Sequence, residues 1–252
     1  ILWFKYRFEL KSLRYYLIFK HKLLKKITIA IDGFSSTGKS TIAKQLAKKL
    51  NYVYVDTGAM YRAVALFVLN NGLINEAGEV KNLVEKLPEI TLNFKLNEET
   101  GNADMYLNGE NVEKEIRTLR VSNVVSTVAA ISEVRKKLVE QQKKMGAEKG
   151  VVMDGRDIGT VVFPDAELKL FMTASAKTRA HRRYKELVDR GEEVTFDAVL
   201  KNVQERDHLD SNREDSPLIQ AETAIEFDNS DMGLKEQFER IYNFALRIIE
   251  KQ

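Results

Sequence analysis

The 252-residue chain has no cysteine, only three prolines, three histidines and one tryptophan. Without cysteine it can form no disulfide bond, thiolate metal site or thiol nucleophile, as expected of a protein in a reducing cytoplasm. No histidine has a second ligand at metal spacing, so we expect none of them to bind a metal ion. No run of about 18 apolar residues occurs, so no transmembrane segment is predicted.

Positive charge is concentrated at the N-terminus. Residues 1–26 contain eight Lys or Arg and one Glu, whereas the remaining chain has 32 basic and 36 acidic residues. The mildly acidic body argues against a nucleic-acid partner. The basic, aromatic extension 1–26 has several interpretations: a helix in weak contact with a membrane surface, a targeting segment without a cleavage site, or an accessory arm without catalytic role, including sequence upstream of the true start.

Residues 33–40 read Gly-Phe-Ser-Ser-Thr-Gly-Lys-Ser, a complete G-x-x-x-x-G-K-[ST] phosphate loop. A strand pattern at 27–31 precedes it and a helical pattern at 39–50 follows, as this motif requires. The loop N–H groups and the helix N-terminus bind phosphate, the lysine reaches the β- and γ-phosphates, and the Ser40 hydroxyl contacts Mg²⁺. The motif predicts a nucleoside triphosphate site at Gly33, Phe34, Ser35, Ser36, Thr37, Gly38, Lys39, Ser40 and Thr41.

Strand and helix patterns alternate from residue 27 onward, which is typical of a parallel sheet wrapped by helices. Apolar strand patterns occur at 27–31, 52–55, 151–153, 168–172 and 224–227. Helical patterns occur at 39–50, 59–70, 118–145, 176–190, 196–208 and 233–250. We therefore expect an α/β fold with a five-stranded parallel sheet flanked by helices, in a single domain over 27–252.

Residues 90–116 break this alternation. Apolar and polar residues alternate from Ile90 to Leu96, and Asn108-Gly109 is a strong signal for a two-residue hairpin turn. The pattern predicts a small antiparallel β insert. A helical lid is expected over about 190–216, where Gly191 ends one helix and Thr195 caps the next.

Three charged motifs lie near the ends of predicted elements. They are DTGAMYR at 56–62, VVMDGRD at 151–157 and ERDHLDSNR at 205–213. In the second motif, Asp154 stands where phosphate-loop enzymes place an acid near Mg²⁺. Fixed arginines stabilise a phosphoryl group in transfer, and an enzyme that holds phosphates from two substrates needs several. The arginines therefore favour a kinase over a hydrolytic switch, although any single one can be a surface ion pair.

The motifs taken together resemble bacterial cytidylate (CMP) kinases from about residue 27 to the C-terminus. The matching segments, in order, are IDGFSSTGKST, DTGAMYR, LNGENV, EIRT, SNVVSTVAA, VRKKL, MDGRDIGTVVFPDA, ASAKTRAHRR and ERDHLDSNR. The resemblance implies transfer of the γ-phosphoryl group of ATP to CMP or dCMP, giving ADP and CDP or dCDP in pyrimidine nucleotide metabolism. It also implies a P-loop kinase core, an insert in the part that binds the monophosphate, and a mobile lid.

The resemblance implies roles for individual residues of the acceptor site. Cytosine is read by Ser126, Arg135 and Asp157, since a carboxylate accepts a hydrogen bond from the exocyclic amino group and repels O4 of uracil. The sugar hydroxyls are held by Arg206 and Asp210. The acceptor phosphate is held by Thr57, Arg62, Arg156 and Arg213.

The resemblance also implies a set of residues for catalysis and for the donor. The catalytic residues are Lys39, Arg62, Arg156 and Arg213. On the donor side, Arg182 approaches the ATP phosphates from the lid, Ser40 contacts Mg²⁺, and Asp154 lies behind it. Two positions depart from the family pattern, which often has serine at Thr57 and glycine at Ser40. No general base is expected, because a phosphate oxygen is already a competent nucleophile.

Two alternatives remain at this stage. One is another small-molecule kinase, acting on UMP, AMP, dTMP or shikimate. The other is a nucleotide-dependent switch or binding module without a soluble acceptor, although the N-K-x-D motif of GTPases is absent. We expect a monomer.

Overall fold

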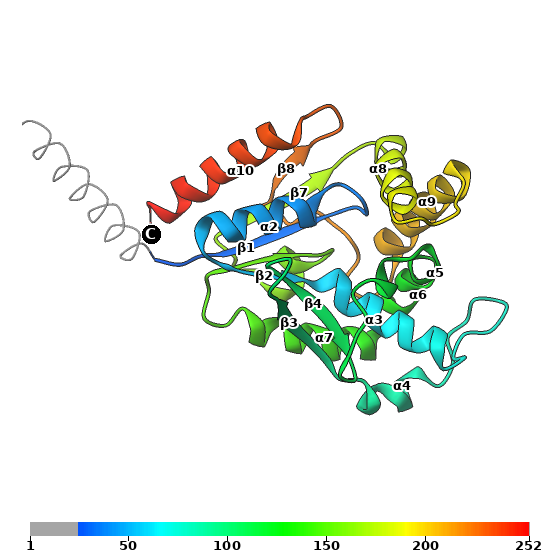
Figure 1. The fold of residues 1–252 in the computed structure, drawn as a ribbon. Helices are drawn as coiled ribbons and strands as arrows, with labels where there is room; N and C mark the ends of the chain where they lie inside the picture. Colours follow the sequence, from blue (N-terminus) through cyan, green and yellow to red (C-terminus); the bar gives the residue numbers. More distant parts are fainter. Residues whose placement is uncertain (1–24, 252) are drawn as a thin grey trace, which may run out of the picture.

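The computed structural model describes residues 25–251 and has a five-stranded sheet at its centre (Figure 1). The strand order is β2-β6-β1-β7-β8, and all neighbouring strands run parallel. The strands are β1 (Thr28–Gly33), β2 (Val53–Asp56), β6 (Val151–Asp154), β7 (Leu168–Thr173) and β8 (Ile225–Asp228). The predicted parallel sheet is confirmed. The basic extension lies outside the described residues, apart from Lys25 and Lys26.

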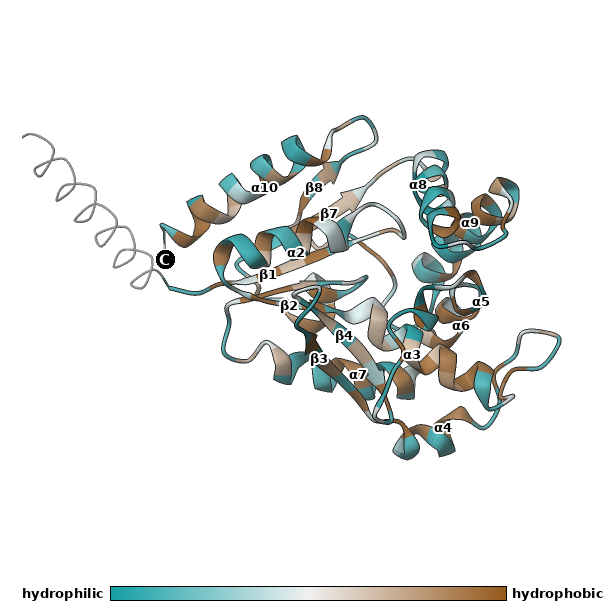
Figure 2. Ribbon diagram, viewed as in Figure 1, coloured by the Kyte–Doolittle hydropathy of each residue, from teal (hydrophilic) through white to brown (hydrophobic). Residues whose placement is uncertain are grey.

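Helices cover both faces of the sheet because its strands are apolar on both sides (Figure 2). Ile29 and Ile31 of β1 pack with α2 (Lys39–Leu50) and α10 (Leu234–Ile249) on one face. The intervening Ala30 packs on the opposite face with the π-helical turn η3 (Ile158–Val162) and with Val139 of α7 (Ser132–Met145). Because all the strands run parallel, their carboxyl ends lie at one edge of the sheet, where the phosphate loop begins.

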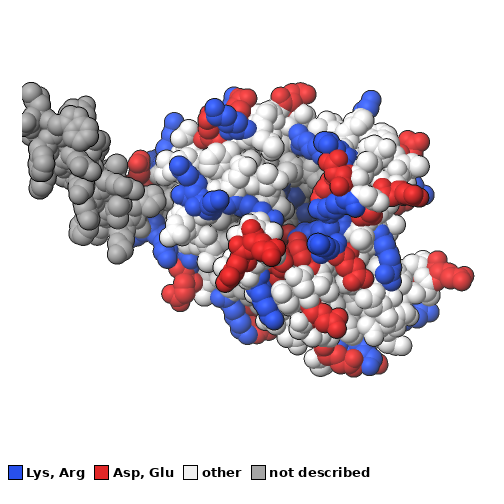
Figure 3. All heavy atoms as spheres, viewed as in Figure 1, with Lys and Arg blue, Asp and Glu red and all other residues white. Residues whose placement is uncertain are grey.

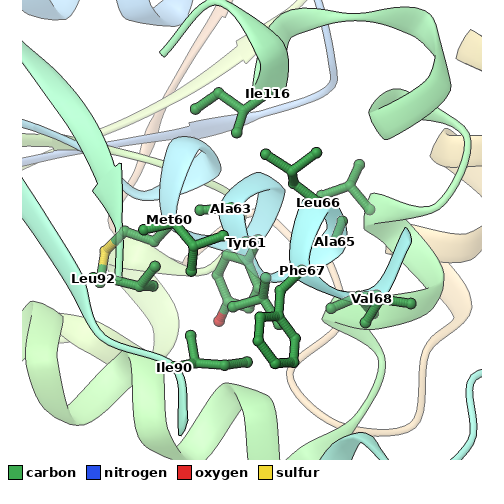
Figure 4. Close-up of a cluster of buried hydrophobic side chains, with 14 of the residues drawn as sticks. Met60, Tyr61, Ala63, Ala65, Leu66, Phe67, Val68, Ile90, Leu92 and Ile116 are labelled. Atoms are coloured by element: carbon green, nitrogen blue, oxygen red, sulfur yellow. The ribbon is translucent and has the colours of Figure 1, made fainter. Parts of the chain in front are cut away.

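The expected antiparallel insert is present beside α3 (Thr57–Asn70). Strands β3 (Leu92–Asn97), β4 (Asn102–Leu107) and β5 (Glu110–Asn111) form it, and Asn108 and Gly109 turn the chain with positive φ angles of 50° and 90°. Figure 4 shows Met60 and Phe67 of α3 beside Ile90 and Leu92 of the insert. A second apolar core therefore anchors the insert, and α3 is buried within it. Between α3 and β3 lie α4 (Leu83–Lys86) and η1 (Leu87–Glu89).

The single helix predicted over 118–145 is wrong. After η2 (Glu115–Arg117), the chain forms α5 (Leu119–Ser122), α6 (Val125–Ala129) and α7. A straight helix rises about 1.5 Å per residue, so it would place Arg135 roughly 14 Å from Ser126. The break before α7 instead allows both residues to line one cavity. No glycine or proline marks the breaks, so the sequence pattern alone predicts one continuous helix.

The predicted lid region, residues 190–216, contains α9 (Phe196–Asn212) and directly follows α8 (Ala176–Asp189), and both helices lie on the right in Figure 1. Helix α8 is capped by Ser175, and α9 by Thr195, whose hydroxyl accepts the N–H of Ala198 at 3.2 Å. Gly191 turns the chain between them with φ 82°. The predicted caps are confirmed, and α9 runs four residues beyond the expected 208. Within residues 25–251, no helix combines the length and apolar character needed to cross a bilayer.

Candidate active site

A cavity of about 370 Å³ lies at the carboxyl edge of the sheet. Figure 3 shows basic and acidic side chains gathered around a hollow in this face. All nine residues expected to hold the acceptor nucleotide line it: Thr57, Arg62, Ser126, Arg135, Arg156, Asp157, Arg206, Asp210 and Arg213. The phosphate loop supplies Ser35, Ser36, Gly38, Lys39, Ser40 and Thr41. Gly33, Phe34, Thr37 and Arg182 are absent from the lining.

The phosphate loop has the conformation that its motif predicts. Ser36 and Gly38 have positive φ angles of 61° and 90°, and Gly38 is the N-cap residue of α2, which has no side-chain cap. An uncapped helix N-terminus presents N–H groups and partial positive charge to an anion. Lys39 Nζ donates to Phe34 O at 2.5 Å and to Thr37 Oγ1 at 3.3 Å. The ammonium group therefore lies over the loop, next to where phosphate binds.

The three loop residues outside the lining, and Arg182, support the loop from behind. A Cβ on Gly33 would lie 2.0 Å from Met172 O, so only glycine fits between β1 and β7. The Phe34 ring packs edge-on against Phe171. Arg182 donates to Oδ1 and O of Asn229, both at 2.9 Å, and Asn229 Nδ2 donates to Thr37 O at 2.6 Å. The described structure thus places Arg182 against the outer side of the loop.

Asp154 sits beneath the loop between two hydroxyl groups. Ser40 Oγ donates to Oδ2 at 2.9 Å, and Tyr54 OH donates to Oδ1 at 2.8 Å. Burial, and then the charge of Asp56, raise the pKa of Asp154 to about 6, against the lowering effect of Lys39 and the two hydroxyls. Within residues 25–251 no three His, Asp or Glu side chains cluster at metal-binding distance. A hydroxyl and one nearby carboxylate suit Mg²⁺, which retains water and phosphate ligands.

Arginines crowd the middle of the cavity without enough acids to balance them. Arg62 donates to Ser122 Oγ at 2.9 Å, and Arg183 donates to the same oxygen at 3.1 Å. Burial, followed by repulsion from Arg206, Arg183 and Arg117, holds the pKa of Arg62 well below its usual value. Unbalanced buried positive charge of this kind marks a site for an anion.

Arg117 is a cavity residue that the sequence reasoning missed. It donates to Asp56 Oδ2 at 2.8 Å and to Glu113 Oε1 at 2.7 Å. Burial lowers its pKa, but the two carboxylates outweigh burial, so the pKa is raised. The carbonyl oxygen of Arg117 accepts a hydrogen bond from Arg183 at 2.6 Å. This contact joins η2 to helix α8. Arg117 belongs to the EIRT segment, but the spacing of that segment in the sequence does not indicate which residues Arg117 contacts.

Two ion pairs line the far end of the cavity. Arg135 pairs with Asp157, and both side chains are at most 4% exposed. Arg156 Nε donates to Asp210 Oδ2 at 2.8 Å. Burial raises the pKa of Asp157 although Arg135 and Arg213 lower it, whereas the pKa of Asp210 is lowered because Arg156 and Arg206 outweigh its burial.

Several buried donors at this end have no acceptor in the described part of the chain. Arg135 Nε, Arg213 Nη2 and the Tyr61 hydroxyl make no hydrogen bond within that part. The two arginine nitrogens lie only at ion-pair distance from carboxylates, 3.9 Å from Asp215 Oδ1 and 4.0 Å from Asp157 Oδ1 respectively. Buried polar groups of this kind are costly unless a ligand satisfies them. Arg206 bridges this region to the phosphate loop, with Nη1 2.7 Å from Ser35 Oγ and Nε 3.4 Å from Ser126 Oγ. This end of the cavity therefore offers N–H donors that make no hydrogen bond, beside the Asp157 carboxylate.

Comparison with known proteins identifies the family to which the chain belongs. The family model described as cytidylate kinase matches residues 29–247. The chain belongs to the cytidylate kinase family. It is 62% identical to a cytidylate kinase of Flavobacterium johnsoniae over 228 residues, covering 90% of this chain and 99% of that protein. It is 54% identical to a cytidylate kinase of Bacteroides fragilis over 217 residues, covering 86% and 95%.

Membership of the cytidylate kinase family makes the chain a nucleoside monophosphate kinase and excludes the switch or binding-module alternative. One cavity is lined by the phosphate loop, by several arginines and by the Arg135–Asp157 pair. A cytidylate kinase needs one shared cavity, because its two substrates must meet phosphate to phosphate.

Proposed function

We propose that this cavity aligns ATP and CMP or dCMP for direct phosphoryl transfer, with the cytosine at the Arg135–Asp157 end. A phosphate oxygen of the monophosphate attacks the γ-phosphorus of ATP. The bond from that phosphorus to the β-phosphate oxygen breaks, and ADP leaves as CDP or dCDP forms. The observation that carries the assignment is the buried Arg135–Asp157 pair, with donor atoms of Arg135 and Arg213 beside it that make no hydrogen bond.

The base is recognised by complementary polar groups. The Asp157 carboxylate accepts from the exocyclic amino group of cytosine. Arg135 Nε, which makes no hydrogen bond within the described residues, donates toward O2 and N3 of the ring. Ser126 contacts the base beside it. Uracil presents an oxygen where cytosine presents the amino group, and two acceptors repel. Because the pocket is buried, an acceptor of Asp157 that faces O4 of uracil instead of a donor is costly, so discrimination against uracil is strong.

The sugar and the acceptor phosphate lie between the base and the loop. Arg206 and Asp210 hold the sugar hydroxyls, and Arg206 already contacts Ser35 of the phosphate loop. The phosphate is held by Thr57, Arg62, Arg156 and Arg213. The repulsion that lowers the pKa of Arg62 is relieved when a dianion enters. Positioning and charge stabilisation then account for catalysis without a general base.

The donor binds at the phosphate loop. N–H groups of the loop and the α2 N-terminus hold the β-phosphate, and Lys39 stabilises charge on the transferred group. Mg²⁺, when bound, neutralises phosphate charge; Ser40 is the hydroxyl that holds it, and Asp154 orients Ser40 through the 2.9 Å hydrogen bond. Arg182 supports this end through Asn229 and Thr37.

We infer that residues 27–252 form one catalytic domain, with residues 1–26 outside it, and that segment 190–216 closes over both nucleotides. Within this segment, Arg206 contacts Ser35 of the phosphate loop and Ser126 of the acceptor side. Closure excludes water, which prevents hydrolysis of ATP. Hydrogen exchange across 190–216 tests the lid: we expect slower exchange with ATP analogue and CMP together than with either alone.

The substitution Asp157→Asn tests the base assignment. The amide can donate to O4 of uracil, so the ratio of kcat/KM for CMP to that for UMP should fall by about tenfold or more. The KM for ATP should be unchanged, because the donor binds at the other end of the cavity. A ratio that stays at the wild-type value in the folded variant overturns the assignment.

A further inference from the structure

Asp157 begins a turn whose first N–H groups it does not cap. The π-helical turn η3 starts directly after Asp157, and the Asp157 side chain makes no capping hydrogen bond. That side chain instead pairs with Arg135. The N–H groups of Ile158 and Gly159 are taken up by the carboxylate of Asp32, at 2.8 Å and 2.7 Å. The cap thus comes from β1, well over a hundred residues earlier in the chain.

We propose that Asp32 is a positioning residue for base selection: it caps the turn in place of Asp157 and thereby leaves the Asp157 carboxylate facing the base. This inference rests on the proposed role of Asp157 in reading cytosine. An aspartate at a helix start normally accepts from the N–H groups two or three residues ahead. Were Asp157 to do so, its carboxylate would turn away from Arg135 and from the cavity.

The geometry around Asp32 is closely constrained on both sides. Asp32 is 4% exposed, and it is followed by Gly33, whose backbone is held against Met172 too closely for any side chain. On the other side, a Cβ on Gly159 would lie 3.3 Å from Asp32 Oδ2, so glycine permits the close approach of the turn. Asp32 therefore links the start of the phosphate loop directly to the turn that carries the base-reading carboxylate.

A purely structural role for Asp32 makes a different prediction from a positioning role. If Asp32 only stabilises the fold, its loss lowers the unfolding temperature but leaves the preference among bases unchanged in the molecules that remain folded. If Asp32 positions Asp157, its loss changes the ratio of kcat/KM for CMP to that for UMP. The ratio is therefore the informative measurement, since the fraction of folded enzyme cancels from it.

The experiment compares Asp32→Asn with wild type in the full-length chain. Asparagine keeps the size of the side chain but turns an NH₂ group toward one of the two N–H donors, which breaks one capping bond. We expect the CMP to UMP ratio to fall about fivefold or more, mainly through a higher KM for CMP, because one of the two capping bonds is lost. Ile29→Val is the matched control: it is buried in the same strand, away from the turn, and should leave the ratio at the wild-type value.

A second variant keeps the test decisive if Asp32→Asn does not fold. Gly159→Ala retains the Asp32 carboxylate but adds a methyl group 3.3 Å from Oδ2, which shifts the turn and the carboxylate apart by a few tenths of an ångström. We expect this variant to lower the CMP to UMP ratio in the same direction. A wild-type ratio in both Asp32→Asn and Gly159→Ala, or in Gly159→Ala alone when Asp32→Asn is insoluble, overturns the proposal.

Asp157→Asn serves as the reference variant in the same assay. If Asp157→Asn lowers the ratio and the Asp32 and Gly159 variants do not, the role of Asp32 is wrong and the base assignment stands. If Asp157→Asn also leaves the ratio unchanged, the base assignment itself is wrong, and the role of Asp32 falls with it.

Discussion

Arg135 and Asp157 form an ion pair that is almost completely buried, although they come from different elements, α7 and the turn after β6. Removing one partner leaves the other as an uncompensated buried charge. We therefore expect Arg135→Met to lower the free energy of unfolding by about 3–5 kcal/mol. Adding Asp157→Asn to that variant should recover part of the loss. Urea unfolding of both single variants and the double variant measures this coupling, and additive losses contradict it.

Arg62 is expected to lower the stability of the folded protein although it supports catalysis. It is buried among Arg206, Arg183 and Arg117, and its pKa is held well below the usual value by burial and by their repulsion. Arg62→Met should therefore unfold at the same or a higher temperature than wild type. Its kcat/KM for CMP should fall by about 100-fold or more, because a fixed cation at the transferred group is lost. Thermal unfolding and steady-state kinetics on one preparation check both, and a clearly less stable variant contradicts the account.

Tyr54 is expected to influence, through Asp154, the Mg²⁺ concentration that the enzyme needs for activity. Its hydroxyl donates to Asp154 Oδ1 at 2.8 Å, opposite the Ser40 hydroxyl. Tyr54→Phe should raise the Mg²⁺ concentration for half-maximal activity by about tenfold, as is typical when a group that orients a metal ligand is lost. Tyr52→Phe is the matched control, because the Tyr52 hydroxyl accepts the N–H of Ile27, outside the cavity lining. Equal Mg²⁺ requirements in the two variants contradict the prediction.

Asp32 should also make stability depend on pH. Burial raises its pKa from 3.8 to about 7, although the Gly159 and Ile158 N–H groups oppose this shift. Between about pH 4 and 7 the folded chain therefore binds a proton that the unfolded chain has released. Stability falls as pH rises through this window, by up to ~1.4 kcal/mol per pH unit. Asp32→Asn lacks this dependence.

Urea unfolding of wild type and Asp32→Asn at several pH values checks this expectation. The stability of wild type relative to the variant should decrease as pH rises from about 4 to 7 and then level off. Because other titrating groups are common to both proteins, they cancel from the difference. A difference that stays constant, or that grows with rising pH, contradicts the raised pKa of Asp32.

The sequence predicted the parts of this molecule that depend on local pattern. The strands of the parallel sheet, the phosphate loop and the Asn108-Gly109 turn follow from residues close together in the chain. The nine acceptor-site residues came from resemblance to a family, and the structure brings all nine to one cavity. Their individual roles stay predictions.

The features that the sequence did not predict depend on contacts between distant segments. Asp32 meets the N–H of Ile158 across 126 residues, and Asn229 meets Thr37 across 192. Arg117 likewise finds Asp56 only when the insert folds back onto α3. The breaks before Val125 and Ser132 are stabilised by packing rather than by a breaking residue, so local propensity could not reveal them.

The most direct test of the whole account is ADP release from Mg²⁺·ATP by the wild-type chain, measured with CMP, dCMP, UMP, AMP, dTMP and no acceptor. The account predicts ADP release with CMP and dCMP far above that with the other nucleotides, and almost none without an acceptor. Equal release with UMP or AMP contradicts the cytosine-reading pocket. Release that is indifferent to every acceptor contradicts phosphoryl transfer between two aligned nucleotides.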